Sequence, residues 1–215
     1  MNLQSITTWL AQNWIEVTAA VLGMIYLILS IKQHISLWLF GLLTSALYIY
    51  VFLVSKFYAD MSLQVYYVII SVYGYIHWKY GNGSTKKLAV SSSGFRLMST
   101  LLAVWLVLWV GMSLFLHHLT DSEVPIGDGF TTAGSIVATW MLARKIKEHW
   151  LFWVIIDLVS LILYISKGLY PTSILFFIYT IMAVAGYVEW HRDYKTNPVK
   201  QLLTRHGLEK QKVIA

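Results

Sequence analysis

The stretch WLFWVIIDLVSLILY, residues Trp150–Tyr164, has thirteen apolar or aromatic residues among its fifteen, with Asp157 in the middle. An apolar run of this kind, extended by its flanking residues, is typical of a helix that crosses a lipid bilayer. A second stretch, WLFGLLTSALYIYVF at residues 38–52, begins with the same three residues and has no acid. The likeness of the two stretches predicts an internal repeat, and the acid in only one of them suggests a functional site.

The composition extends this interpretation to the whole chain. Of the 215 residues, 58% are hydrophobic and 12% are charged, whereas soluble domains carry about 25% charged residues. We therefore predict an all-α, polytopic membrane protein with seven transmembrane helices. The apolar segments lie at about 14–31, 35–54, 61–78, 97–116, 130–143, 150–166 and 172–190.

The repeat is found by aligning Trp38 with Trp150 and continuing in both directions without a gap. Tyr67 then falls on Tyr179, and GYIHW at 74–78 falls on GYVEW at 186–190. This repeat alignment predicts two parallel three-helix repeats on either side of one helix, a layout that transporters use to place a substrate near the middle of the membrane. The predicted parts are an interfacial segment 1–13, a first repeat 14–79, a linker with the fourth helix 80–127, a second repeat 128–191 and a basic cytoplasmic tail 192–215.

The distribution of Lys and Arg predicts the orientation of these helices. With the N-terminus outside, fourteen basic residues fall on the cytoplasmic side and two, Lys56 and Lys167, fall outside. Cytoplasmic loops of membrane proteins carry such an excess of Lys and Arg. The net charge of +6 is thus a topology signal facing anionic lipid, and we expect no nucleic-acid partner.

Several classes of chemistry find no support in the sequence. The chain has no cysteine, and no two of its seven histidines stand three or four residues apart, as ligands of a metal hydrolase on one helix would. No phosphate-binding G-x-x-x-x-G-K-[ST] or nucleophile G-x-S-x-G motif occurs. The segment 172–190 has no Lys that could bind retinal. We therefore predict a protein that is not an enzyme and that uses no metal or cofactor.

Asp157 is the strongest candidate for a functional residue. An acid inside a membrane is costly unless it is neutralised, hydrated or paired. It shares one helix face with Trp153 and Ser160, whereas the first repeat has Gly41 and Ser45 at the positions of Trp153 and Asp157. A protonated structural Asp remains an alternative to a substrate or ion site.

Polar and aromatic residues of neighbouring segments complete a predicted cavity. Gln64 and Tyr67 share a face of the third segment, and Tyr179 stands at the matching place in the seventh; packing or an interfacial belt could also explain these aromatics. One acid with several π faces suits a flat cationic molecule. The candidate substrate-binding residues are Tyr48, Gln64, Tyr67, Trp150, Trp153, Asp157, Ser160 and Tyr179.

Three stretches of the chain resemble the PnuC family of bacterial vitamin transporters, which is related to the SWEET sugar transporters. They are KQHISLWLFG (32–41), DMSLQVYYVIISVYGYIHW (60–78) and residues 149–190 with their W-x-x-W, acid and K-G-L-Y elements. The resemblance spans residues 14–190 and implies a SWEET-like fold and a homotrimer in the bacterial inner membrane. Gln64, Trp153, Asp157 and, with a weaker match, Tyr179 correspond to the substrate site.

The same resemblance implies a function. Family members are facilitators that take up vitamin precursors, chiefly nicotinamide riboside, which a cytoplasmic kinase then traps by phosphorylation. Thiamin, the substrate of a related branch, is the alternative. A proton-coupled carrier in which Asp157 titrates is the rival mechanism.

Overall fold

The protein is described here by a computed structural model that covers residues 14–54, 58–81, 88–120 and 122–196. All regular elements in these ranges are α-helices, which confirms the predicted all-α class and seven helices. The predicted segment 1–13 and the tail from residue 197 lie outside the described residues. The helices are α2 (Trp14–Ile31), α3 (Leu37–Val54), α4 (Tyr58–Tyr80), α5 (Phe95–Leu119), α6 (Pro125–Ala143), α7 (His149–Ser166) and α8 (Tyr170–Thr196).

Apolar length explains four of these helices, and burial explains the Thr- and Ser-rich α6. Among the described residues, α3, α5, α7 and most of α8 are long and apolar enough to cross a membrane. The Thr- and Ser-rich α6 has the most buried residues of any described helix and packs against α4, α5 and α7. Its Ala133 and Ala138 are fully buried. Because its neighbours are protein and its residues are small, α6 needs less hydrophobicity than a lipid-facing helix.

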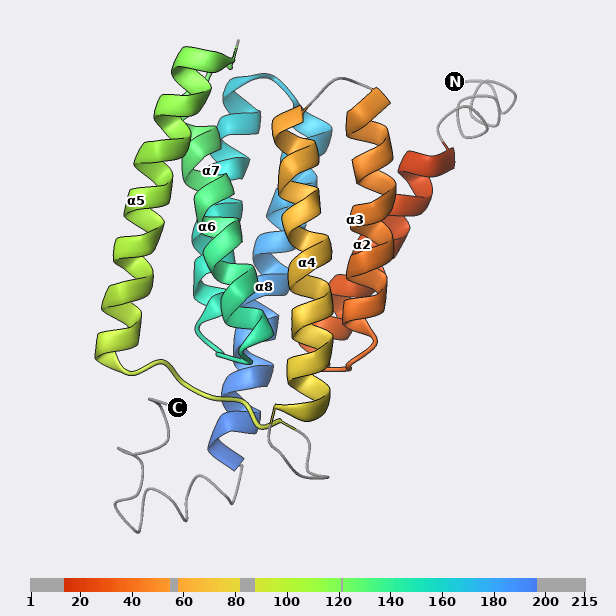
Figure 1. The fold of residues 1–215 in the computed structure, drawn as a ribbon, viewed down its shortest axis with the longest axis vertical. Coiled ribbons are helices and arrows are strands. Elements are labelled where there is room, and N and C mark those ends of the chain that lie inside the picture. The colour runs from red at the N-terminus through yellow and green to blue at the C-terminus, as the bar shows by residue number, and fades with distance from the viewer. Residues whose placement is uncertain (1–13, 55–57, 82–87, 121, 197–215) are drawn as a thin grey trace.

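The helix bounds follow the repeat alignment that pairs Trp38 with Trp150. In this alignment α3 coincides with α7 at both ends, α2 and α6 end at matching residues, and α4 and α8 begin at matching residues. In Figure 1, α4 and α8 both descend toward the end of the bundle at which the linker to α5 begins. The triplets α2–α4 and α6–α8 therefore have the same orientation.

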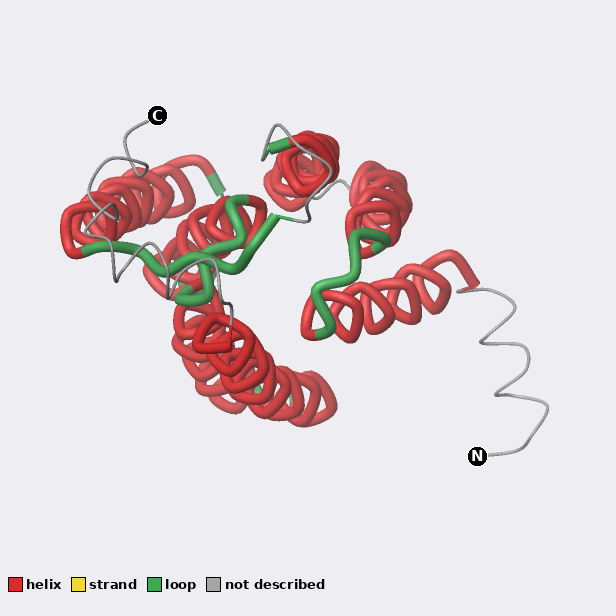
Figure 2. The backbone as a smooth tube through the Cα atoms, turned by 90° about the horizontal axis from the view of Figure 1, so that it is seen from below, coloured by secondary structure: helices red, strands yellow, loops and turns green. Residues whose placement is uncertain are grey.

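The two triplets meet through two helix pairs. Helix α4 packs against α6, α2 packs against α8, and α5 packs against the outer side of α6. The view along the helices in Figure 2 shows the bundle with the linker crossing one end of it. We call this end, where α2, α4, α6 and α8 finish, the basic end. Of the Lys and Arg residues in the described ranges, only Lys167 lies at the opposite end.

Four indole rings pack together near the basic end. This tryptophan cluster consists of Trp38, Trp78, Trp150 and Trp190, none more than 6% exposed. The Trp78 and Trp190 rings, one from each triplet, lie 6.1 Å apart. Within each triplet a glycine makes room for one ring, because a Cβ on Gly74 would lie 2.4 Å from Trp38 and a Cβ on Gly186 would lie 2.5 Å from Trp150.

The cluster also joins the triplets by hydrogen bonds. Trp190 Nε1 donates to the Ser30 carbonyl at 3.0 Å. Trp78 Nε1 donates to the carbonyls of Leu142 at 3.3 Å and Ala143 at 3.2 Å. Trp78 matches Trp190 in the repeat alignment, and Ser30 matches Leu142. Each triplet therefore donates one indole N–H to the equivalent carbonyl of the other triplet. A buried bond of this type contributes about 0.5–1.5 kcal/mol.

The same turn presents the acceptor carbonyl in each triplet. Gln33 has a φ of 53° and Lys145 has a φ of 58°, the left-handed conformation that reverses the chain after a helix. Each turn amide donates to the carbonyl three residues back, Gln33 to Ser30 at 3.1 Å and Lys145 to Leu142 at 2.9 Å. The carbonyls of Ser30 and Leu142 thus accept both a turn amide and an indole, one with each lone pair.

The second triplet carries an additional layer at the basic end. Residues 88–94, here called the strap, run along the α6–α7 turn. The Ser91 amide donates to the Lys145 carbonyl at 2.9 Å, and the Lys147 amide donates to the Ser91 carbonyl at 3.0 Å. Glu148 accepts hydrogen bonds from the Ser92 hydroxyl and the Ser93 amide, so the strap is held by backbone and side chain together.

Glu148 is stabilised as a carboxylate in this layer. Its Oε1 lies 2.7 Å from Lys147 Nζ. Burial by itself would raise the pKa of Glu148, but the hydrogen bonds from Lys147, Ser92 and Ser93 outweigh burial and hold this pKa below its ordinary value. An ionised Glu148 therefore adds to the backbone hydrogen bonds that hold the strap.

Candidate functional site

A cavity of about 210 Å³ lies between the triplets. Most of its wall comes from the first triplet, and the second contributes one residue each from α6 and α7. The lining residues are Tyr26, Gly41, Thr44, Ser45, Tyr48, Gln64, Tyr67, Ile70, Ser71, Thr139 and Trp153. Tyrosine and tryptophan rings, Ser and Thr hydroxyls and one amide make up nearly the whole surface, which can stack a flat ring and hydrogen-bond its substituents.

Differences between the triplets create this single hollow. A Cβ on Gly41 would lie 3.0 Å from the Tyr26 ring and 3.2 Å from Ser71 Oγ, so glycine lets three helices approach without closing the space. The second triplet has Trp153 at the position of Gly41, and this side chain forms the facing wall. The substitution turns a symmetric backbone into an asymmetric site.

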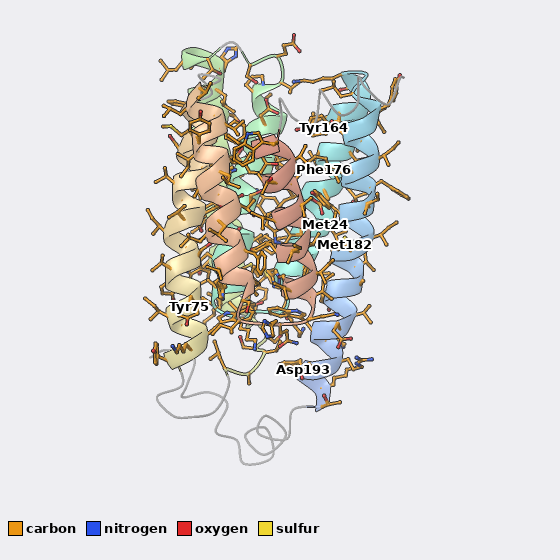
Figure 3. All side chains as sticks on the ribbon, turned by 90° about the vertical axis from the view of Figure 1, so that its right-hand side faces the viewer. Met24, Tyr75, Tyr164, Phe176, Met182 and Asp193 are labelled. Carbon is orange, nitrogen blue, oxygen red and sulfur yellow. The ribbon has the colours of Figure 1, made fainter. Side chains whose placement is uncertain are left out.

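A second difference fills the matching region of the other triplet. Gln64 lines the cavity, but Phe176 stands at its repeat position and stacks on Tyr164 with ring centroids 5.0 Å apart. Figure 3 shows this pair toward the end of the molecule opposite Asp193. In the second triplet, the Tyr164–Phe176 pair therefore stands where the first triplet has the Gln64 side chain.

Hydroxyl groups form the polar side of the cavity. Tyr67 and Thr139 both line the cavity, and Thr139 Oγ1 donates to the Ser135 carbonyl at 2.7 Å. Thr44 Oγ1 is buried and has no hydrogen-bond partner among the described residues. A ligand in the cavity can therefore bond Thr44 without breaking a protein hydrogen bond.

Asp157 lies one helical turn beyond Trp153 on α7. It is 5% exposed, and it makes no hydrogen bond or ion pair with any residue of the described ranges. Tyr179 interacts electrostatically with the Asp157 carboxyl and, separately, with Tyr48. Asp157 is thus a buried acid beside the cavity that retains its capacity to bind a cation.

The structure divides the predicted site residues into two groups. Tyr48, Gln64, Tyr67 and Trp153 line the cavity. The other four lie outside its lining: Asp157 and Ser160 are buried on α7, Tyr179 contacts Phe176 at its ring edge, and Trp150 belongs to the tryptophan cluster.

Four lining residues had no signal in the sequence that singled them out: Tyr26, Thr44, Ile70 and Thr139. Tyr26 stands in a segment otherwise poor in polar side chains over its last turns, and Thr44 lies next to Ser45 on α3. Thr139 is one of several Thr and Ser residues of α6. Which hydroxyl of a Thr- and Ser-rich helix faces a cavity follows from the tertiary contacts of α6, and periodicity alone does not specify it.

Comparison with known proteins identifies the family. The nicotinamide mononucleotide transporter family model matches residues 13–192. The nicotinamide riboside transporter PnuC of Escherichia coli is 27% identical over 203 residues, covering 83% of this chain and 85% of the relative. The PnuC of Neisseria mucosa is 29% identical over 196 residues, covering 85% of this chain and 74% of the relative.

A more distant relative and a solved structure agree with this result. The riboflavin/roseoflavin transporter RibM of Streptomyces davaonensis is 24% identical over 184 residues, covering 82% of this chain and 84% of RibM. A crystal structure of the vitamin B3 transporter PnuC superposes with a TM-score of 0.70 at 26% identity, covering 89% of this chain and 86% of that one.

These relatives are transporters and not enzymes, as predicted, and the apolar helices place the chain among multi-pass membrane proteins. The family model spans well over half of the sequence, so the chain belongs to the nicotinamide mononucleotide transporter family that the PnuC resemblance predicted.

Proposed function

We propose that this protein carries nicotinamide riboside across the bacterial inner membrane by facilitated diffusion. The observation that carries the proposal is a cavity walled by Trp153, with the buried Asp157 one helical turn away. Nicotinamide riboside joins a flat cationic ring to a sugar, and two relatives are named as its transporters. The ring suits an indole and the positive charge suits an acid.

Each group has a distinct role in this proposal. Trp153 stacks the pyridinium ring, an attraction worth about 0.5–2 kcal/mol. Asp157 balances the ring charge, and Tyr179, which interacts with both Asp157 and the cavity residue Tyr48, links it to the same site. Gln64 and the free hydroxyl of Thr44 bond the carboxamide and the ribose.

The proposed mechanism is alternating access by the two triplets around the cavity. The basic end faces the cytoplasm and the N-terminus lies outside, because Lys and Arg concentrate at that end. Net uptake depends on a cytoplasmic kinase that phosphorylates the arriving substrate. A homotrimer is the proposed assembly, on the strength of the family resemblance.

Calorimetric titration of the purified protein with nicotinamide riboside, thiamin and riboflavin tests the substrate. Binding of nicotinamide riboside that weakens at least ~10-fold in Trp153→Ala supports the proposal, since the stacking wall is lost. Binding of thiamin or riboflavin alone would reassign the substrate. In proteoliposomes, uptake that stops at equal concentrations inside and outside supports facilitated diffusion.

A proton-coupled carrier is the second candidate, and the isolation of Asp157 favours it. A buried acid without an ion partner among the described residues can carry a proton between the two sides. Uptake into proteoliposomes with and without an imposed proton gradient separates the candidates. Accumulation above the outside concentration that depends on the gradient and disappears in Asp157→Asn would replace facilitated diffusion.

A further inference from the structure

We propose that Trp78 and Trp190 are the inner gate of this transporter, holding the basic end shut through their two reciprocal bonds between the triplets. The inference rests on the transport function proposed above and adds to it the residues that must separate for the substrate to leave. Neither residue lines the cavity, so their role is distinct from substrate binding.

The position of the cluster supports a gate. Tyr26, Tyr67 and Trp153 line the cavity and also pack against the core that contains all four cluster tryptophans. The acceptor carbonyls belong to the last turns of α2 and α6, at the basic end. The tryptophan cluster is therefore the floor of the cavity on the side of the basic end.

The four tryptophans divide into two kinds of contact. Trp38 packs over Gly74, and Trp150 packs over Gly186, so each stays within its own triplet. Trp78 of α4 bonds to the end of α6, and Trp190 of α8 bonds to the end of α2. These last two contacts cross the only helix pairs that join the triplets in the described part of the chain.

Rocking of the triplets must therefore act on Trp78 and Trp190. Relative movement that widens the basic end lengthens both indole–carbonyl bonds and parts the two rings, which lie 6.1 Å apart. Trp38 and Trp150 move with their own glycines and keep their packing. Because the two crossing bonds are related by the repeat, loss of either one should loosen the gate to a similar extent.

Only two of the four cluster indoles form a hydrogen bond within the described residues, and the other two provide a matched control. Trp38 Nε1 and Trp150 Nε1 are buried with no partner among the described residues. Trp38→Phe therefore removes an indole of the same cluster without removing a hydrogen bond, whereas Trp78→Phe and Trp190→Phe remove one contact of the gate each. Comparison of the three variants separates the bond from the loss of ring volume.

Cysteine labelling measures the gate directly, because the natural chain has no cysteine. Ser71→Cys places one thiol in the cavity wall, and a membrane-impermeant maleimide is applied to sealed inside-out vesicles without substrate. Labelling of a separate Lys195→Cys variant verifies that the basic end faces the reagent. In the Ser71→Cys background, Trp78→Phe and Trp190→Phe should each raise the labelling rate about 5-fold, the factor that corresponds to one hydrogen bond of about 1 kcal/mol.

Trp38→Phe is the control, and the labelling rates that would contradict the gate can be stated in advance. Trp38→Phe should leave the rate within about 2-fold of the parent, since no bond is lost. Equal rates in all variants, or a rise in Trp38→Phe as large as in the other two, overturns the gate. Because no substrate is present, failure of nicotinamide riboside to bind would refute the proposed function and leave this result standing.

A second measurement does not require any tryptophan to be replaced. Gln33 Nε2 of the α2–α3 turn and Asp193 Oδ2 of α8 lie 3.4 Å apart at the basic end, across the same triplet interface. A direct disulfide needs two Cβ atoms about 4 Å apart, so Gln33→Cys with Asp193→Cys is joined instead by a bifunctional methanethiosulfonate, whose spacer replaces the lost side-chain length and holds this interface closed. The cross-link should cut labelling of Ser71→Cys from the basic end at least ~5-fold, with recovery on reduction, and unchanged labelling would contradict the proposal.

Discussion

Gly41 and Trp153 occupy the same place in the two triplets, and the cavity lies between the hollow that one leaves and the wall that the other forms. Equivalent positions of the repeated backbone thus carry the smallest residue in one triplet and the largest in the other. The size of residue 41 is therefore expected to control whether a ligand can enter.

Filling this hollow should weaken the binding of nicotinamide riboside. Gly41→Leu places a side chain where a Cβ already lies 3.0 Å from Tyr26, so we expect the affinity for nicotinamide riboside to fall at least ~10-fold, a loss of about 1.4 kcal/mol. Calorimetry measures the change. Gly111→Leu on α5 is the matched control, because a Cβ there meets nothing within 4 Å; an equal loss in both variants would count against the cavity as the site.

The charge of Asp157 should matter for cations and little for neutral ligands. Asp157→Asn keeps the shape of the side chain and removes its charge, so we expect affinity for nicotinamide riboside to fall about 10-fold, as for a partly buried charge pair worth roughly 1–2 kcal/mol. Reduced nicotinamide riboside, whose ring is neutral, should change by less than about 2-fold in the same titration. A parallel loss for both ligands would assign Asp157 a structural role.

Ionisation of Glu148 should make the strap sensitive to acid. The pKa of Glu148 is lowered on folding from its ordinary 4.5, so its contribution to stability is present above pH 4.5 and is lost as the pH falls through the lower folded value. Glu148→Gln should melt at a lower temperature than the parent at neutral pH, and the gap should narrow in acid. Thermal melts of both proteins from about pH 7 to about pH 3 measure it.

Glu189→Gln is the control for this pH series. Glu189 pairs with Arg192 on the exposed face of α8, where an ion pair contributes about 0–1 kcal/mol. Its melting temperature should stay close to that of the parent at every pH. If the gap between the parent and Glu148→Gln is the same at neutral and at acid pH, the carboxylate does not hold the strap.

The left-handed turn at Gln33 should accept glycine with a gain in stability. Glycine adopts positive φ without the steric cost that other residues bear, and the gain on replacing Gln33 should be about 0.5–1 kcal/mol after the entropy cost of glycine. Gln33→Ala should not stabilise. Lys145→Gly is the informative comparison, because Lys145 also donates to the Leu88 carbonyl and covers the Trp78 ring, and loss of these contacts should offset the gain. Thermal melts of the three variants beside the parent measure the differences.

The architecture could be predicted from the sequence because its signals are local and repeated. Apolar runs define the helices, and the alignment that places GYIHW on GYVEW also places the bounds of α3 on those of α7. Trp153 and Gln64, which line the cavity, could be singled out for the same reason, since polar or aromatic deviations are visible against an apolar background.

The parts that escaped prediction depend on contacts between distant segments. Nothing in the sequence distinguishes Trp78, which bonds across the triplet interface, from an interfacial aromatic. Residues 91–93 have the composition of a simple linker, yet they are hydrogen-bonded to the α6–α7 turn. Thr139 reaches the cavity only because α6 lies between α4 and α7.

Helix α5 packs on the outer side of α6 and contributes no residue to the cavity lining. Its role follows from the number of times the chain crosses the membrane between the two triplets. A unit of three spans begins and finishes on opposite sides of a membrane, so a direct head-to-tail fusion of two units would leave the second upside down. One added span gives the second triplet the same orientation in the membrane as the first. The constraint on α5 is then to cross once and to hold α6, which leaves the chemistry of transport to the six helices that it keeps in register.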